Sequence, residues 1–260
     1  TVTNALAAAD LNTIADATAG VVTATLAADT AITADTVTAL DKVATTDTIS
    51  YTADTSVITA DATALAALAA KVDTANATAF ANVATITSVA GTDVAAALAI
   101  IPNAKVTVTN ALAAADLNTI ADATDGAVTA TITTGAVKAT LDAITAVTAA
   151  DTITFITDDT TVNASDLVNL AAKVDTADAT AYATVGTITQ TDAITNVIAA
   201  LAIKTDAAVE VGTVSAVDLN SVAADGNAGN ITATITTGLA AGMATAITAV
   251  DANDTITFEV

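Results

Sequence analysis

The chain has 260 residues, 53% of them hydrophobic but only 2% aromatic, and its formal net charge at pH 7 is −22. Binding to nucleic acid or to an anionic membrane requires a basic surface. The chain has 6 lysines against 28 acidic residues and cannot form such a surface. Histidine and cysteine are absent, which removes the usual nucleophile–base pairs, so we do not expect an enzyme.

Taken in chain order, the predicted elements occur in copies, because residues 1–18 return letter for letter as residues 107–124. Residues 128–135 recur as residues 231–238 with one change, which gives a long period of about 103 residues. A fainter period of about 52 residues lies inside it. The segment Leu-Ala-Ala-Lys-Val-Asp-Thr-Ala occurs twice, and the chain divides into units at approximately residues 1–54, 55–107, 108–158, 159–211 and 212–260.

Each unit contains runs of strand-type alternation and stretches of helical spacing. In the strand-type runs, apolar residues share one face and threonines take the other. These runs are residues 22–26, 106–108, 128–132 and 153–155. Apolar residues at helical spacing predict helices around Leu65, Leu68 and Val72, around Val137, Leu141 and Ile144, and around Ile194, Val197, Ile198 and Leu201. The smallest module is therefore about 25 residues, one strand plus one short helix.

A strand and a helix of this size cannot bury their apolar faces alone, so each module must stack on its neighbours. The sequence predicts an α/β solenoid of about ten coils, with parallel strands on one side and right-handed crossovers through the helices. A β-solenoid is the alternative. We expect residues 1–260 to form a single elongated array, and an excerpt of a longer chain, because the polar caps of a solenoid are missing.

Nearly all the acidic residues are aspartates, which favour turns and helix starts because their short side chains reach backbone N–H groups. Asp10, Asp116, Asp166 and Asp218 each stand at the start of an apolar helical stretch, which predicts a capping role. Ser215 and Asp218 have the spacing of a capping box.

Calcium is the sharper hypothesis for the aspartates, since Ca²⁺ takes six to eight oxygen ligands. Asp47, Asp151 and Asp254 recur only every fourth coil, roughly 19 Å apart if strands stack about 4.8 Å apart, which is too far for a shared ion. The adjacent pair Asp158 and Asp159 is the best local candidate for calcium ligands. We predict no catalytic residue and no other cofactor site.

Two further residue patterns recur along the chain. The Thr-x-Thr motifs at residues 23–25, 129–131 and 232–234 resemble the rows of ice-binding β-solenoids, although β propensity alone also explains them. The aromatic residues occur at positions that we expect to lie in the core, because they recur with the strands. They are Tyr51, Phe80, Phe155, Tyr182 and Phe258.

The aspartate-leucine helix starts, the Thr-Ala-Thr-Ile strands and the Asp-Thr-Ile-Thr-Phe segments resemble the alanine- and threonine-rich arrays of giant bacterial surface proteins. These include large secreted adhesins, S-layer-like proteins and the swimming-motility surface protein of marine cyanobacteria. The resemblance implies export to the cell exterior and a structural or adhesive role.

The first functional hypothesis is a structural spacer or scaffold in an extracellular filament or surface layer. The alternative is an adhesive module whose threonine-rich strand face contacts a polysaccharide, ice or a mineral surface. The expected partners are neighbouring copies of the array and, in the adhesive alternative, a surface or a glycan. No apolar run reaches the 18 residues of a membrane helix, so we expect no membrane insertion.

Overall fold

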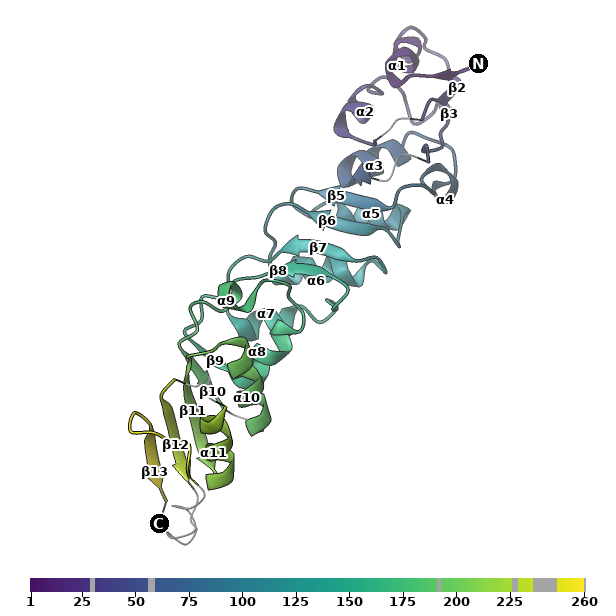
Figure 1. The fold of residues 1–260 in the computed structure, drawn as a ribbon. Helices are drawn as coiled ribbons and strands as arrows, with labels where there is room; N and C mark the ends of the chain where they lie inside the picture. The colour runs from purple at the N-terminus through teal and green to yellow at the C-terminus, as the bar shows by residue number, and fades with distance from the viewer. Residues whose placement is uncertain (29–30, 56–58, 191–192, 226–228, 236–246, 260) are drawn as a thin grey trace. The chain divides into compact units, whose positions relative to one another are not determined.

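The computed structural model describes the whole chain except residues 29–30, 56–58, 191–192, 226–228, 236–246 and 260. The chain forms two compact units. Unit 1 contains Thr1–Thr131 and Ala150–Thr152, and unit 2 contains Ile132–Ala149 and Ile153–Val260. Strands and helices alternate along most of both units, and two strands or two helices follow each other directly at β3–β4, α3–α4, β8–β9 and α8–α9 (Figure 1).

The described strands are β1 (Ala5–Leu6), β2 (Thr23–Leu26), β3 (Thr48–Ser50), β4 (Thr59–Asp61), β5 (Thr85–Ser88), β6 (Lys105–Val108), β7 (Val128–Thr131), β8 (Thr152–Thr154), β9 (Thr161–Asn163), β10 (Thr187–Thr189), β11 (Ala208–Val214), β12 (Ile231–Ile235) and β13 (Thr255–Phe258). The described helices are α1 (Ala8–Asp16), α2 (Ala34–Thr38), α3 (Ala62–Ala69), α4 (Asn76–Ala79), α5 (Val94–Ile100), α6 (Ala114–Asp122), α7 (Val137–Ala143), α8 (Ala164–Ala171), α9 (Asp178–Ala181), α10 (Ile194–Ile203) and α11 (Ala216–Ala224).

The strands form three sheets, ordered β1-β2-β3, β4-β5-β6-β7-β8 and β9-β10-β11-β12-β13. Within each sheet, neighbouring strands are consecutive in the sequence, and the pairs with an assigned register are parallel. Parallel neighbours need a crossover, and helices occupy most of the crossovers. The predicted α/β class is confirmed, and the all-β alternative does not describe this chain. In unit 2, α8, α10 and α11 lie along one side of the strands β9 to β12 (Figure 1).

The strand and helix predictions are confirmed where the apolar pattern was clearest. β2, β6, β7 and β8 overlap the four alternating runs, and α3, α7 and α10 lie on the stretches of helical spacing. In β2 the outward-facing Thr23 and Thr25 are exposed while Ala24 and Leu26 are buried. Two of the predicted helical residues, Val72 and Ile144, lie outside these helices, since α3 ends at Ala69 and α7 ends at Ala143.

The core consists of aliphatic side chains and many alanines. In unit 2, Leu167 and Leu170 of α8 are fully buried, and α8 packs against α7 and α10. Burying such a leucine stabilises the fold by about 2 kcal/mol. Alanines such as Ala60 and Ala233 take inward strand positions, where a small side chain lets helix and strand approach closely.

The aspartates predicted to cap helices lie inside the first turn instead. The N-cap residues of α1, α6, α8 and α11 are Ala7, Ala113, Asn163 and Ser215, and Asp10, Asp116, Asp166 and Asp218 follow three positions later. A carboxylate there interacts favourably with the helix macrodipole but does not occupy the cap. The predicted Ser215–Asp218 pair is bonded: Ser215 Oγ accepts from the Asp218 N–H at 3.1 Å and donates to Asp218 Oδ2 at 2.8 Å.

Four of the five aromatic residues are buried as predicted, although Phe80 and Tyr182 stand at the C-terminal ends of α4 and α9 rather than on strands. Tyr51, Phe80, Phe155 and Tyr182 are at most 1% exposed, and the Tyr51 and Phe80 ring centroids are 5.8 Å apart. The prediction is wrong for Phe258, which is 49% exposed. Phe258 lies on β13, the last described strand of its sheet, and among the described residues no aromatic ring covers it as Phe80 covers Tyr51.

The Tyr182 hydroxyl is buried, and none of the residues that the structure describes accepts from it or donates to it. Burial, followed by the nearby Asp178 charge, raises the pKa of Tyr182 above its usual range. We expect Tyr182→Phe to raise the free energy of unfolding by about 1 kcal/mol, because a buried unpaired hydroxyl costs free energy. Phe80 already occupies the same position one repeat earlier. Urea unfolding measures the change, and a loss of stability would contradict it.

Candidate functional site

The calcium candidates Asp158 and Asp159 lie in the segment between β8 and β9. Asp158 is exposed, whereas Asp159 Oδ2 accepts a hydrogen bond from the Val137 N–H at 2.7 Å. The Asp159 N–H donates to Thr157 Oγ1 at 3.1 Å. Within the described part of the chain, no group of three or more acidic, histidine or cysteine side chains could hold a metal ion. Asp159 therefore has a structural contact of its own, and calcium binding stays a prediction.

The aspartates that recur every fourth predicted coil have a shared structural role. Asp47 Oδ1 accepts from the Val22 N–H at 2.8 Å, and Asp151 Oδ1 accepts from the Val128 N–H at 2.7 Å. In unit 2, Asp254 Oδ1 accepts from the Ile231 N–H at 2.8 Å. Each aspartate directly precedes a strand and bonds the backbone at or just before the start of the neighbouring strand. We call Asp47, Asp151 and Asp254 the strand clamps.

The second oxygen of two strand clamps bonds the chain just before them. Asp47 Oδ2 accepts from the Ala44 N–H at 2.8 Å, and Asp254 Oδ2 accepts from the Asp251 N–H at 2.9 Å. Asp47 and Asp151 are only 7% exposed. A buried carboxylate must be hydrogen-bonded, and these carboxylates obtain their partners from the backbone of two adjacent segments. Their recurrence was visible in the sequence, but their partners were not.

A second recurring feature covers the edge of β3 in unit 1. The Ile49 N–H donates to Asp73 Oδ2 at 2.7 Å, and the Tyr51 N–H donates to Thr74 Oγ1 at 2.9 Å. The Asp73 N–H in turn donates to the Ile49 carbonyl at 2.7 Å. Lys71 Nζ donates to the Val43 carbonyl at 2.8 Å. Side chains thus take the place of another strand where the sheet β1-β2-β3 ends.

The same arrangement is repeated in unit 2. The Ile153 N–H donates to Asp175 Oδ2 and the Phe155 N–H donates to Thr176 Oγ1, both at 2.7 Å. Lys173 Nζ donates to the Val147 carbonyl. We call the pairs Asp73–Thr74 and Asp175–Thr176 the edge caps. The sequence carried a signal for them in the two copies of Lys-Val-Asp-Thr-Ala, but sequence reasoning assigned them no role.

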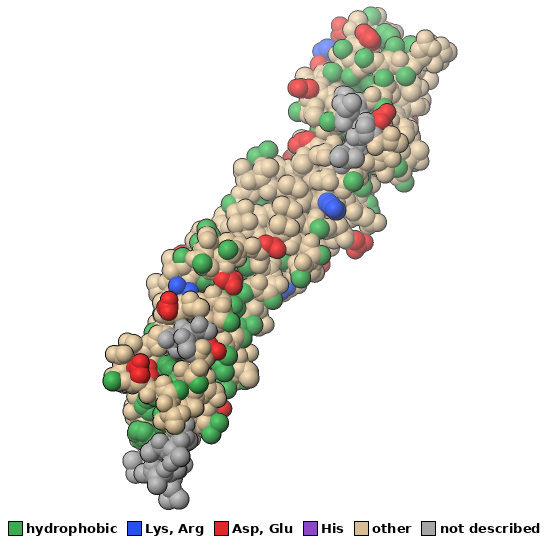
Figure 2. Space-filling model, viewed as in Figure 1, with side chains coloured by type: hydrophobic (Ala, Val, Ile, Leu, Met, Phe, Trp, Pro, Cys, Tyr) green, Lys and Arg blue, Asp and Glu red, His purple; other side chains and the backbone are tan. Residues whose placement is uncertain are grey.

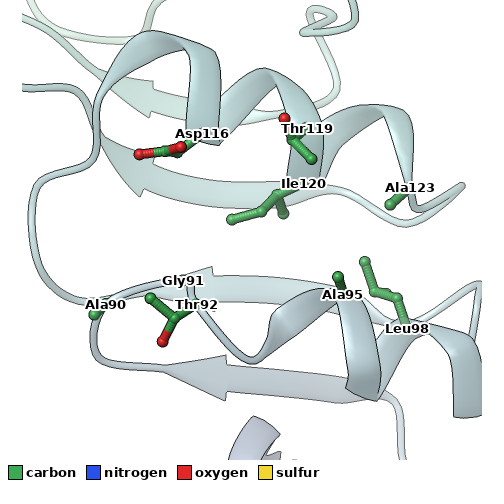
Figure 3. A pocket seen from close by; sticks show the side chains of 9 residues that line it. All are labelled: Ala90, Gly91, Thr92, Ala95, Leu98, Asp116, Thr119, Ile120 and Ala123. Carbon is green, nitrogen blue, oxygen red and sulfur yellow. The ribbon is translucent and has the colours of Figure 1, made fainter.

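A hollow of about 240 Å³ lies between α5 and α6 of unit 1 (Figure 3). Leu98 and Ile120 point into it from the two helices, and Asp116 lies at one end. Asp116 is the one titratable side chain among the residues that line the hollow. Thr119 Oγ1, also on the lining, donates to the Ala115 carbonyl of its own helix at 3.0 Å. Small-molecule sites usually measure about 300 to 1,000 Å³, so this hollow is smaller than a typical ligand site, and we assign it no ligand.

The threonine faces are partly regular. In unit 2, Thr232 pairs with Thr255 and Thr234 pairs with Thr257, which places threonines side by side on β12 and β13. Glu210 of β11 pairs with Thr232 and interrupts the row on its other side. In unit 1, Thr85 pairs with Lys105. The rows are therefore short, and an ice-binding or glycan-binding role for them stays a prediction.

Acidic side chains are scattered over the face of the molecule in Figure 2 rather than gathered into one patch. The two described ion pairs, Lys42 with Asp41 and Lys138 with Asp142, are exposed and contribute little to stability. Across the described residues, no helix is both long enough and apolar enough to cross a membrane.

The strand clamps and the edge caps are thus the features in which both the residues and their hydrogen bonds are repeated. Both join neighbouring segments of backbone. No family model, no curated protein and no solved structure matches this chain.

Proposed function

We propose that the chain is a structural repeat segment of an extracellular filament or cell-surface layer, in which it acts as a spacer or scaffold. In this proposal the modules stack as an α/β solenoid of about ten coils. The partners are neighbouring copies of the same array.

The observation that carries the proposal is that the strand clamps recur with the same geometry in the repeats. In each case the clamp joins one segment of backbone to a neighbouring segment. All three strand clamps bond backbone that lies 23 to 25 residues away in the sequence, about one module. A repeat in which each module bonds the neighbouring module can be lengthened without a new fold. The acidic surface supports the same role, because a net charge of −22 keeps a long array soluble and limits non-specific association.

The adhesive alternative depends on the threonine faces. A face that binds a regular surface should keep its exposed residues from strand to strand, and Lys105 and Glu210 interrupt the described rows. The spacer role requires only that the core and the joining contacts recur. It therefore remains the better supported function.

The spacer role predicts how size grows with the number of copies. We expect small-angle scattering of one, two and four linked copies to give a maximum dimension that rises in proportion to copy number, about fourfold for four copies. Compact packing of the same copies would give a rise of only about 1.7-fold. Electron microscopy of the four linked copies should show thin fibres. A compact particle in both measurements would contradict the proposal.

A further inference from the structure

β3, β8 and β13 occupy the same place in the repeat. Each is the last strand of its sheet, and each directly follows a strand clamp. Their sequences correspond as well, since residues 151–155 return letter for letter as residues 254–258. What covers the edges of β3 and β8 therefore indicates what the edge of β13 can bind.

The backbone of β13 presents the same two donors at its edge as the other two strands. The Glu259 N–H donates to the Ile235 carbonyl at 3.1 Å, so this position faces β12. Because N–H groups alternate in direction along a strand, those of Ile256 and Phe258 point to the opposite side. The corresponding N–H groups of Ile153 and Phe155 donate to the edge cap Asp175–Thr176.

The side chain of Phe258 provides an independent observation at the same edge. Phe258 is 49% exposed, whereas Tyr51 and Phe155, which occupy the same repeat position, are 1% and 0% exposed. The Tyr51 ring packs against Phe80, which follows its edge cap in the sequence. A large aromatic surface and two edge-facing backbone donors thus occur together on β13.

We propose that the edge of β13 binds a further repeat segment that carries the Lys-Val-Asp-Thr-Ala sequence and its following aromatic residue, as residues 173–182 do. The aspartate carboxylate accepts from the Ile256 N–H, and the threonine hydroxyl accepts from the Phe258 N–H. The lysine donates to the Val250 carbonyl, the counterpart of the Val43 and Val147 carbonyls that Lys71 and Lys173 bond. The aromatic ring covers Phe258.

This inference rests on the proposed array function, because it identifies the partner of this scaffold as another repeat of the same kind. It also explains how an exposed strand edge avoids unspecific association. Natural sheets protect such edges with charged or covering groups, and here the covering segment combines one cation with one anion.

The test appends a copy of residues 158–185 directly after Val260, which keeps the register because Glu259 and Val260 correspond to Ile156 and Thr157. We expect amide exchange at Ile256 and Phe258 to slow by roughly tenfold or more. The control appends the same segment with the changes Asp175→Ala and Thr176→Ala made in the copy only. The control should slow exchange at these two amides much less. Equal slowing with both extensions, or none with the native one, would overturn the proposal.

A second measurement tests the proposal even if the appended segment does not fold. In the 260-residue chain itself, Asp175→Ala should speed exchange at the Ile153 amide by about tenfold and leave the Ile49 amide, whose cap is Asp73, unchanged. If Ile153 does not respond, the edge cap is not a binding element and the proposal fails. Either failure would leave the spacer role standing, because scattering from linked copies measures that role separately.

Discussion

Replacing Gly126 with alanine is expected to lower the free energy of unfolding of unit 1 by about 2–3 kcal/mol, because the added methyl group meets backbone. A Cβ at this position would lie 2.6 Å from the Ala104 carbonyl carbon and 2.8 Å from the Lys105 nitrogen. Neither atom can move without shifting the start of β6. The neighbouring strand therefore requires glycine here.

Gly20 is the matched control, because it occupies the same position in the first copy of the repeat. The nearest atom to a Cβ there is Thr18 Oγ1 at 3.6 Å, an ordinary contact. Both glycines donate their N–H to the threonine two residues earlier, Thr18 and Thr124, so that bond is common to the two sites. Gly20→Ala should be neutral or stabilising by up to about 1 kcal/mol, because alanine reduces the entropy of the unfolded chain.

Urea unfolding followed by circular dichroism gives both free energies, and amide exchange in residues 104–131 locates the loss. Opposite signs for the two alanine variants would show that packing against the preceding strand, rather than the local turn, requires glycine. Equal effects of the two substitutions on the free energy of unfolding would show that the local backbone conformation, and not the contact with the preceding strand, requires glycine. At the corresponding position in unit 2, a Cβ on Gly229 would lie 2.9 Å from the Asp206 carbonyl oxygen, which extends the same argument to the third copy.

The sequence predicts the elements of this fold well, because repetition displays each apolar pattern several times. The alternation of Thr23, Ala24 and Thr25 indicates a strand with one buried face, and the structure has that strand. The spacing of Val197 and Leu201 indicates a helix with a buried side, and α10 buries both residues. These are local patterns, so a sequence window of ten residues contains the information.

Contacts between modules are less predictable, since they depend on which strand lies beside which. Asp47 bonds the backbone of Val22, 25 residues earlier, and nothing in the residues around Asp47 indicates that partner. Identical sequences even differ in burial. Leu112 is 5% exposed, whereas its counterpart Leu6 in the first copy is only partly buried. The two residues have the same neighbours in sequence but different neighbours in space.

The edge caps show the same limit. Lys173, Asp175 and Thr176 stand within four residues of one another, and their repetition at Lys71, Asp73 and Thr74 marks them as special. Their function as a substitute for a strand became visible only when β3 and β8 were located as the last strands of their sheets. Sequence repetition therefore indicates where a joining contact lies, and the structure identifies what it joins.

The second large effect is expected at a strand clamp. Asp47→Ala removes the acceptor of the Val22 and Ala44 N–H groups in a site where Asp47 is 7% exposed. Hydrogen bonds to a charged group contribute about 1.5–3 kcal/mol, and a buried donor without an acceptor adds a penalty, so we expect a loss of about 3 kcal/mol. Asp47→Asn should cost less, because the amide keeps one carbonyl oxygen.

Asp10→Ala is the matched control, since it removes the same charge from an exposed position in the first turn of α1. Its expected loss is at most about 1 kcal/mol, from the helix macrodipole. Urea unfolding gives the two free energies, and amide exchange at Val22 and Ala44 should accelerate only in the Asp47 variant.

The comparison also separates two physical effects. In a chain with a net charge of −22, loss of any acidic residue reduces self-repulsion, which by itself would stabilise both variants equally. A larger loss at Asp47 than at Asp10 therefore measures the clamp, and equal values would show that it contributes no net stability.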